Sequence, residues 1–331
     1  MISVNYISMD IHIRNEIEFE KILQNEWPKA VSLTRVRMSL QQLLDSKTSE
    51  KQLQKRLREY ISQMDNAFRF IASQSNVELR QQPAFRWTVD HQSVSTPCWR
   101  IEMILPRVAL ATTLHRDGLV AIAEQKHIEA GNLFEQACQL YKQTSDIMQQ
   151  WRWRIPSLNA PVFQKCWHDG EHHHMLAMKN MCMLSAAIER AASPSTCFTV
   201  AQRAVKHCAI ALSHWPNSQV FHTLPIAETM RYVYSSTILW NAQHYGASIC
   251  TLTKWVNPAI NTGPFARIGE ELETIPLLLR ERQHTNDGAY FEKVESKFEL
   301  ITPYNLIHTE SDVPHPTRMS IPDEAHDSDI N

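Results

Sequence analysis

The chain has 331 residues, of which 43% are hydrophobic and 21% are charged, and its formal net charge at pH 7 is −2. This balance is ordinary for a globular protein and gives no sign of the positive charge that nucleic-acid binding requires. No apolar run approaches the roughly 18 residues of a membrane-spanning helix, and Met1-Ile2-Ser3 begins neither a signal peptide nor a myristoylation site. We therefore expect a soluble, cytoplasmic protein.

The chain is poor in glycine, with seven residues where an average usage of about 7% would give roughly 23. Because glycine serves tight turns and close approach of the backbone to ligands, this scarcity indicates a mostly helical chain. The glycines form no G-x-G-x-x-G, no P-loop and no Gly-x-Ser-x-Gly elbow. The seven cysteines contain no C-x-x-C pair, which is typical of reduced, buried thiols. These patterns exclude nucleotide-binding loops and the nucleophile elbow of serine hydrolases, and we expect no cofactor.

The N-terminal third combines extended segments with helices. Residues 2–13 alternate in hydrophobicity, with a break, which predicts extended structure. Helical periodicity predicts helices over 16–27, 31–44 and 49–71. Between 83 and 101, aromatic and β-branched runs flank polar residues, which predicts a β-hairpin that can pair with residues 2–13 in a small antiparallel sheet.

The predicted helix over 49–71 has two different sides. Leu57, Tyr60 and Met64 belong to its apolar stripe, and Lys51, Lys55, Arg56 and Arg58 lie on the other side. A basic face of this kind is usually solvated, and contact with a membrane surface or a partner is the alternative.

The stretch from Glu102 to Trp153 predicts two long helices packed against each other. Its second half places Ala130, Phe134, Ala137 and Tyr141 on one side at a spacing of three and four residues. The two halves are joined by Glu124-Gln125-Lys126 with almost no loop, so we expect the helices to be antiparallel.

Helices continue through the C-terminal half. A helical pattern beginning at Pro161 extends to Ala191, and Ser193-Pro194 is typical of an N-cap and first turn. Further patterns predict one long helix from Ile226 to before Pro258 and another over 265–282, in which Pro276 should introduce a kink or shorten the helix. The antiparallel arrangement indicates a solenoid of helix hairpins, although no strict repeat motif recurs.

Several short motifs occur in the order in which one known family carries them. They are Ile2-Ser3-Val4, Phe85-Arg86-Trp87, Glu102, the segment Ala130 to Tyr141, and Asn286-Asp287-Gly288-Ala289-Tyr290 followed by Val294. With these motifs the chain resembles the BRO (Bro-one type) domain family of endosomal-sorting scaffolds, over residues 1–300. Residues 301–331 are rich in Pro, Asp, His and Ser, and we expect them to form a disordered acidic tail.

The resemblance implies a mainly α fold: an elongated, curved solenoid of antiparallel helix hairpins, similar to tetratricopeptide repeats, with a small N-terminal antiparallel sheet. It also implies a non-enzymatic scaffold whose groove binds the amphipathic C-terminal helix of an ESCRT-III subunit. Such a protein would be cytoplasmic and recruited to endosomes, with peripheral membrane contact and no nucleic-acid partner. The alternative is a scaffold of the same fold for another partner, either a small GTPase or a pH-signalling adaptor.

The resemblance places the family's groove positions on Met183, Thr196 and Val200. A separate argument also favours Val200, because the core stripe of its helix includes Phe198 and Ala201 and leaves Val200 off that face. The alternatives are that Val200 is an isolated surface residue and that Met183 belongs to the core.

A cluster of metal-ligand residue types lies between His168 and His174, with Cys166, Glu171 and Cys182 near it in the sequence. His168 and His172 have the i, i+4 spacing that can share a metal, and a metal-dependent hydrolase is the enzyme alternative. However, no H-E-x-x-H motif occurs, Gly170 can break the helix, and consecutive histidines point in different directions. The preferred interpretation is a polar helix face without metal.

Overall fold

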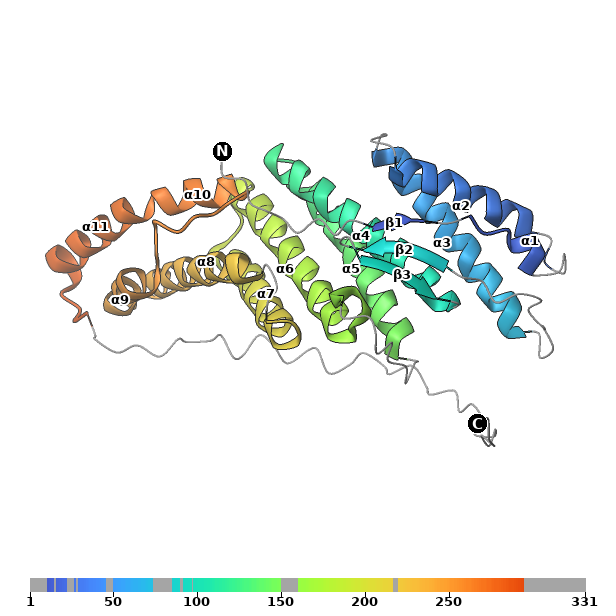
Figure 1. Cartoon of the computed structure of the whole chain (residues 1–331). Coiled ribbons are helices and arrows are strands. Elements are labelled where there is room, and N and C mark those ends of the chain that lie inside the picture. Colours follow the sequence, from blue (N-terminus) through green and yellow to red (C-terminus); the bar gives the residue numbers. More distant parts are fainter. Residues whose placement is uncertain are drawn as a thin grey trace, which may run out of the picture. The chain divides into compact units, whose positions relative to one another are not determined.

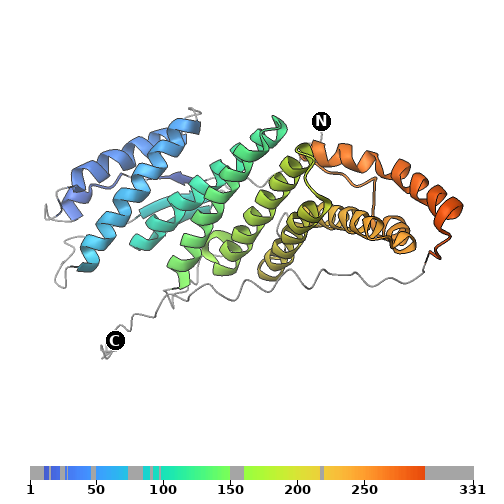
Figure 2. The ribbon, with the colours of Figure 1, turned by 180° about the vertical axis from the view of Figure 1, so that it is seen from behind.

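Helices account for most of the structure, a computed structural model that describes residues 11–14, 16–22, 27, 29–45, 50–73, 85–89, 92–96, 98–149, 160–216 and 220–294. Successive helices pack against one another in chain order, from α2 (Ala30–Asp45) to α9 (Tyr245–Trp255), as Figures 1 and 2 show from opposite sides. The predicted mainly α fold of helix hairpins with a small sheet is confirmed. The tail predicted over 301–331 lies outside the described residues.

The sheet consists of β1 (Ile11–Ile13), β2 (Phe85–Val89) and β3 (Gln92–Thr96), antiparallel and in that order. Ile13 pairs with Trp87, which in turn pairs with Val94, and these three side chains are buried. They share one face because residues directly opposite each other on paired antiparallel strands point to the same side of the sheet. The predicted sheet is therefore present, and residues 2–10 lie outside the described part of the chain.

Three helices follow the first strand in the described part of the chain, and α2 packs against that strand as well as against its neighbouring helices. Of the helix predicted over 16–27, the structure describes α1 (Phe19–Ile22), so that helix begins later than predicted. α2 packs against α3 (Glu50–Ser73), where Leu57, Tyr60 and Met64 are buried as predicted.

A buried carboxylate ties this N-terminal part to the central helices. Glu102, on α4 (Trp99–Ala123), is fully buried and accepts hydrogen bonds from Arg37 Nε at 2.7 Å, Tyr60 OH at 2.5 Å and Trp87 Nε1 at 2.6 Å. Burial and the negative charge of Glu102 raise the pKa of Tyr60, so the phenol stays protonated and donates. The carboxylate therefore joins α2, α3, β2 and α4 through charged and neutral donors.

The antiparallel pair predicted from Glu102 to Trp153 is confirmed as α4 and α5 (His127–Gln149). Their connection is a tight turn in which Gln125 adopts a positive φ of 59° and Lys126 N donates to Ala121 O at 2.8 Å. This pattern is the hydrogen-bonded helix ending that usually places glycine in the left-handed position. Residues 150–159 lie outside the described residues.

The next pair is α6 (Lys165–Glu189) and α7 (Pro194–His214), preceded by a short 3₁₀ turn, η1 (Pro161–Phe163). The break suggested at Gly170 is wrong, because α6 continues through it. A Cβ atom at Gly170 would lie 2.8 Å from Trp215 Cβ, closer than real Cβ atoms approach other atoms. This glycine therefore permits close packing of α6 against the end of α7.

The single long helix predicted from Ile226 is wrong. The structure has two helices, α8 (Val220–Asn241) and α9, which pack against each other. The chain reverses at Gln243, which has a φ of 67°, and His244 N donates to Leu239 O at 2.9 Å. Apolar residues on both sides of this turn happen to preserve helical spacing, so periodicity did not reveal it.

The last helices are α10 (Ala266–Glu273) and α11 (Ile275–Thr285), separated at Thr274. Pro276 lies in the first turn of α11, so the predicted interruption is confirmed, as a helix start rather than a kink. A π turn, η2 (Asn286–Tyr290), follows, and the Tyr290 ring stacks on Tyr245 at 3.8 Å between centroids.

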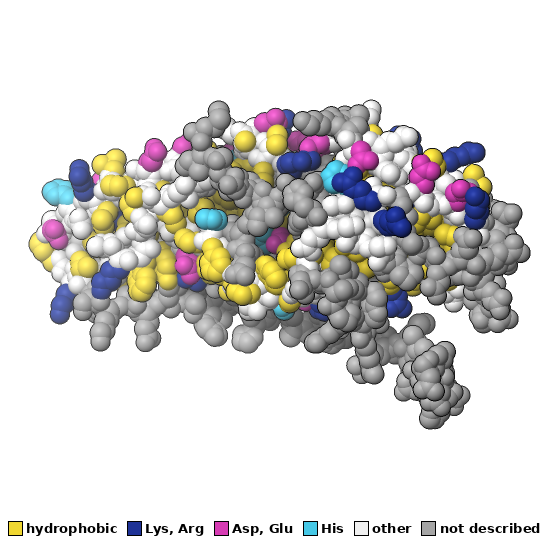
Figure 3. All heavy atoms as spheres, in the orientation of Figure 1, with side chains coloured by type: hydrophobic (Ala, Val, Ile, Leu, Met, Phe, Trp, Pro, Cys, Tyr) yellow, Lys and Arg dark blue, Asp and Glu magenta, His cyan; other side chains and the backbone are white. Residues whose placement is uncertain are grey.

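On the face in Figure 3, hydrophobic side chains are scattered among charged ones rather than segregated from them.

Candidate functional site

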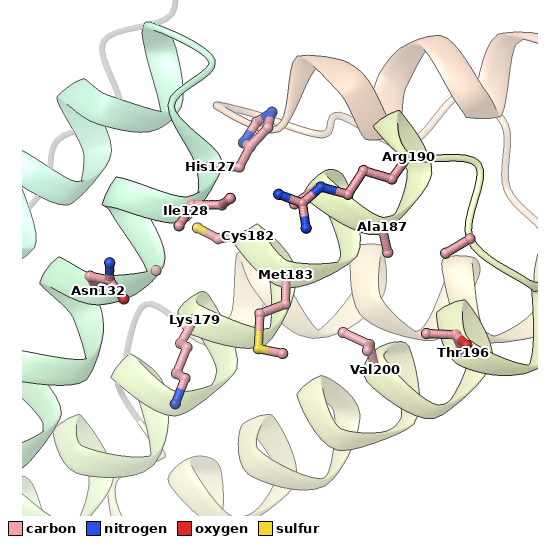
Figure 4. A pocket seen from close by; sticks show the side chains of 13 residues that line it. His127, Ile128, Asn132, Lys179, Cys182, Met183, Ala187, Arg190, Thr196 and Val200 are labelled. Carbon is pink, nitrogen blue, oxygen red and sulfur yellow. The ribbon is translucent and has the colours of Figure 1, made fainter.

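A hollow of about 500 Å³ lies where α5, α6 and α7 meet (Figure 4). Met183 on α6 and Thr196 and Val200 on α7 line it, so the structure brings together the three residues predicted for the groove. The N-terminal turns of α5 supply Ile128 and Asn132 on the opposite side. The hollow is therefore built from three consecutive helices.

Of the three predicted residues, Met183 is the one whose side chain is large, apolar and exposed. Its side chain is 43% exposed, so the alternative that it belongs to the core is wrong. Ile128, across the hollow, is 57% exposed. Two accessible apolar side chains facing one cavity are typical of a surface that another molecule can cover.

Val200 differs from both sequence interpretations. It is only 8% exposed, and it packs with the core while also lining the hollow. It is therefore neither an isolated surface valine nor free of the core. Its side chain contributes to the floor of the hollow rather than to the rim.

The start of α7 is fixed by the cap predicted from the sequence. Ser193 is the N-cap, its side chain accepts a hydrogen bond from Thr196 N at 3.2 Å, and Pro194 occupies the first turn. Ser193 Oγ and Thr196 Oγ1 also lie 2.9 Å apart. This cap satisfies a free amide of the first turn and holds Thr196 at the end of the hollow.

Small side chains open the space between the helices. Gly131, Ala186, Ala187 and Ala192 all line the hollow, and the Cys182 side chain is fully buried beneath them. Larger residues at these positions would bring atoms into the cavity and fill it. The volume of the hollow therefore follows from a local run of small residues on facing helices.

One end of the hollow is polar. His127 is 4% exposed, and its Nε2 lies 3.0 Å from Glu189 Oε1, yet neither ring nitrogen makes an aligned hydrogen bond with a residue that the structure describes. A second hollow of about 490 Å³ adjoins the first and shares His127, Ile128 and Arg190 with it. Arg190 extends over the first hollow (Figure 4). Apolar side chains therefore fill the middle of the site, and polar groups lie at this end.

The contribution of α5 was missed by the sequence analysis. Ile128 follows the Glu124–Lys126 turn and lies outside the apolar stripe of its helix. An exposed isoleucine off the stripe was a usable signal, but single apolar surface residues are common and rarely mark a site. Lys179 also lines the hollow and forms an ion pair with Glu135.

The histidines between 168 and 174 face different partners. His168 is buried between Thr144 Oγ1 at 2.9 Å and Val162 O at 2.8 Å, and burial lowers its pKa to about 4. His172 Nδ1 lies 3.1 Å from Cys138 O, and His174 Nδ1 lies 3.4 Å from Glu171 Oε2.

Cys166 lies near Gln164, and Cys182 belongs to the floor of the hollow, so the two cysteines do not join the histidines. Among the residues that the structure describes, no group of three or more His, Cys, Asp and Glu side chains is arranged to hold a metal ion. The divergent contacts of the histidines give no support to a hydrolase site.

Helices packed in chain order, each pair burying its apolar faces against the next, define a solenoid of antiparallel helix hairpins. None of the helices in the described ranges has the length and apolar character that crossing a bilayer would need. No family model and no curated protein matches the chain.

Solved structures identify the fold. The chain is similar to the ALIX BRO1–CHMP4C complex, with 12% identity, a TM-score of 0.69, and coverage of 90% of this chain and 93% of that one. It is also similar to ALIX bound to the SIVmac239 PYKEVTEDL late domain, with 12% identity and a TM-score of 0.67. That match covers 90% of this chain and 48% of the ALIX chain. A third similar structure is that of a Bro1 domain, solved to explain endosomal targeting by that domain. It has 12% identity and a TM-score of 0.59, and the match covers 88% of each chain. The chain therefore has the Bro1-domain fold.

Proposed function

We propose that this protein is a non-enzymatic scaffold of endosomal sorting that binds the amphipathic C-terminal helix of an ESCRT-III subunit. The observation that carries the proposal is Met183, 43% exposed above a hollow of about 500 Å³ that Val200 and Thr196 also line. An amphipathic helix presents apolar side chains on one face, and a groove between helices accepts them. The ALIX BRO1 structure with CHMP4C supports this choice of partner.

The shape of the hollow suits a helix better than a small molecule. It is open along α6 and α7, and its apolar lining comes from several turns rather than from one enclosed pocket. Met183 and Ile128 would pack against the apolar face of the partner, while Asn132 and Thr196 remain able to form hydrogen bonds at the edges. In the cytoplasm, binding of this surface to an ESCRT-III subunit would recruit the protein to endosomes.

The direct test is a fluorescence anisotropy titration with a labelled peptide from the C-terminal helix of CHMP4C. We expect saturable binding, with a dissociation constant in about the micromolar range for one short helix in an open groove. A peptide with the same composition in scrambled order should not bind, because it has no continuous apolar face. Equal binding of both peptides would contradict the proposal.

A pull-down from cytosol with identification of the bound proteins tests the choice of partner. We expect ESCRT-III subunits to be captured by the unaltered protein and lost when Met183 is replaced by aspartate. Capture of a small GTPase or a pH-signalling protein through the same surface would instead assign the scaffold to another pathway.

A further inference from the structure

The hollow continues along α7 into a surface that carries positive charge. Thr196 and Val200 line the hollow, and Arg203 and His207 follow them at spacings of three and four residues. Residues at this spacing share one face of a helix. The face of α7 that borders the hollow therefore changes from apolar to basic within two turns.

The facing side of α6 changes in the same way. Lys179 precedes Met183 by one turn and also lines the hollow, and His172 and His173 lie two turns further back. His173 Nδ1 and His207 Nδ1 are 3.2 Å apart, which shows that the two helix faces meet at this level. The basic parts of α6 and α7 are therefore neighbours in space.

Positive charge prevails in this region. Arg203 and Lys206 are exposed, and neither forms an ion pair with any residue that the structure describes, while Lys179 pairs with Glu135. Burial lowers the pKa of His207, and the positive charges of Lys206, His172, Arg203 and Lys179 lower it further. The lowered pKa leaves His207 neutral at pH 7, so we call Lys179, Arg203 and Lys206 the cationic stretch.

The acidic residues nearby leave this charge largely uncompensated. Asp169 is held by Lys165 Nζ and by Ser145 Oγ, each at 2.5 Å, and Glu171 lies beside His174. Glu135 is therefore the carboxylate that faces the cationic stretch among the contacts described, against three permanently charged side chains. A partner with carboxylates at this level would balance the excess.

From this juxtaposition we infer that the helix bound in the hollow has two parts, with apolar side chains over Met183 and Val200 and Asp or Glu side chains over the cationic stretch. The inference rests on the proposed function and adds the chemistry of the partner. Val200 and Lys206 are six residues apart on α7, which corresponds to about 9 Å along a helix. The acidic group therefore lies about two turns from the apolar anchor of the partner.

Synthetic helical peptides test the charge preference. Three labelled peptides of equal length share one leucine stripe: the first carries glutamates on the same face about two turns beyond it, the second has glutamine at those positions, and the third has lysine. We expect the glutamate peptide to bind the unaltered protein about tenfold more tightly than the glutamine peptide, through a few partly exposed ion pairs. The lysine peptide should bind most weakly, and high salt should reduce the differences.

Charge reversal on the protein tests the location. Arg203→Glu should abolish the preference for glutamate over glutamine, whereas Arg280→Glu, at an exposed arginine of α11, should retain it. Circular dichroism of both variants should match that of the unaltered protein, because both sites are exposed. A preference that survives Arg203→Glu overturns the assignment to this stretch.

The peptides also separate this inference from the proposed function. Equal binding of the glutamate and glutamine peptides overturns the two-part partner but leaves a helix-binding hollow. If none of the three peptides binds, both the inference and the helix-binding function are overturned.

Discussion

Replacement of Met183 by aspartate should remove helix binding while leaving the fold intact. Met183 is 43% exposed on α6 and lines the hollow, so its side chain takes part in binding more than in the core. In the free protein the new carboxylate remains solvated, and substitution at such a position changes stability by about 0.5 kcal/mol or less. In the complex the same carboxylate would be covered by the apolar face of the partner.

The expected loss follows from the exposed part of the side chain. Full burial of a methionine side chain contributes about 1.5–3 kcal/mol, and 43% of Met183 remains to be covered, so its loss alone costs about 1 kcal/mol. An ionised carboxylate without a partner in an apolar contact adds about 2 kcal/mol or more. A total of about 3 kcal/mol corresponds to more than a hundredfold weaker binding.

The assay is an anisotropy titration with the CHMP4C peptide, together with thermal unfolding. Met38→Asp is a matched control, since Met38 is 37% exposed on α2 and does not line the hollow. Val200→Asp is a poorer test: Val200 is 8% exposed, so a carboxylate there should lower stability as well as binding. Unchanged peptide affinity in Met183→Asp, or an equal loss in Met38→Asp, would refute the reasoning.

Other substitutions test the fold around the site. Glu102→Gln should lower the free energy of unfolding in urea by about 3 kcal/mol, because a buried guanidinium loses its counter-charge; a change within experimental error would contradict this. Gly170→Ala should cost about 1–3 kcal/mol, since its Cβ would crowd Trp215, while Gly288→Ala, with open space around it, should be neutral. His168 has a pKa of about 4 against its ordinary 6.5, because burial disfavours the charged form. The folded protein therefore binds fewer protons than the unfolded chain between these values, and its stability should fall as the pH drops through that window, by up to about 3 kcal/mol. Urea midpoints that agree at neutral pH and at about pH 5 would refute this.

The elements that the sequence predicted well are those whose local signals agree with their packing. The hairpin of α4 and α5 was predictable because long apolar stripes flank a very short connection. The start of α7 was predictable because Ser193 and Pro194 each favour the conformation that they adopt. In both cases the residues that determine the structure are close together in the sequence.

The turn between α8 and α9 lacked such a signal. Among the described residues, three helix connections reverse the chain through a residue with positive φ other than glycine: Gln125, Ala191 and Gln243. In each, the following residue donates its amide to a carbonyl five residues earlier. Glycine normally occupies that position, so its absence hid the break, and packing of α9 against α8 determines where the chain turns.

The position of Val200 shows why the candidate site was only partly predictable. A surface helix has one apolar stripe, but α7 packs against α6 on one side and α8 on the other, so it has two buried faces. Val200 lines the hollow that α7 forms with α5 and α6, and an analysis that takes Phe198 and Ala201 as the single stripe treats that face as surface. That face becomes a hollow where Gly131, Ala186 and Ala187 leave space between the helices, a property of residues on three helices taken together. The packing that builds the hairpin series therefore also produces the groove, wherever small side chains meet between consecutive helices.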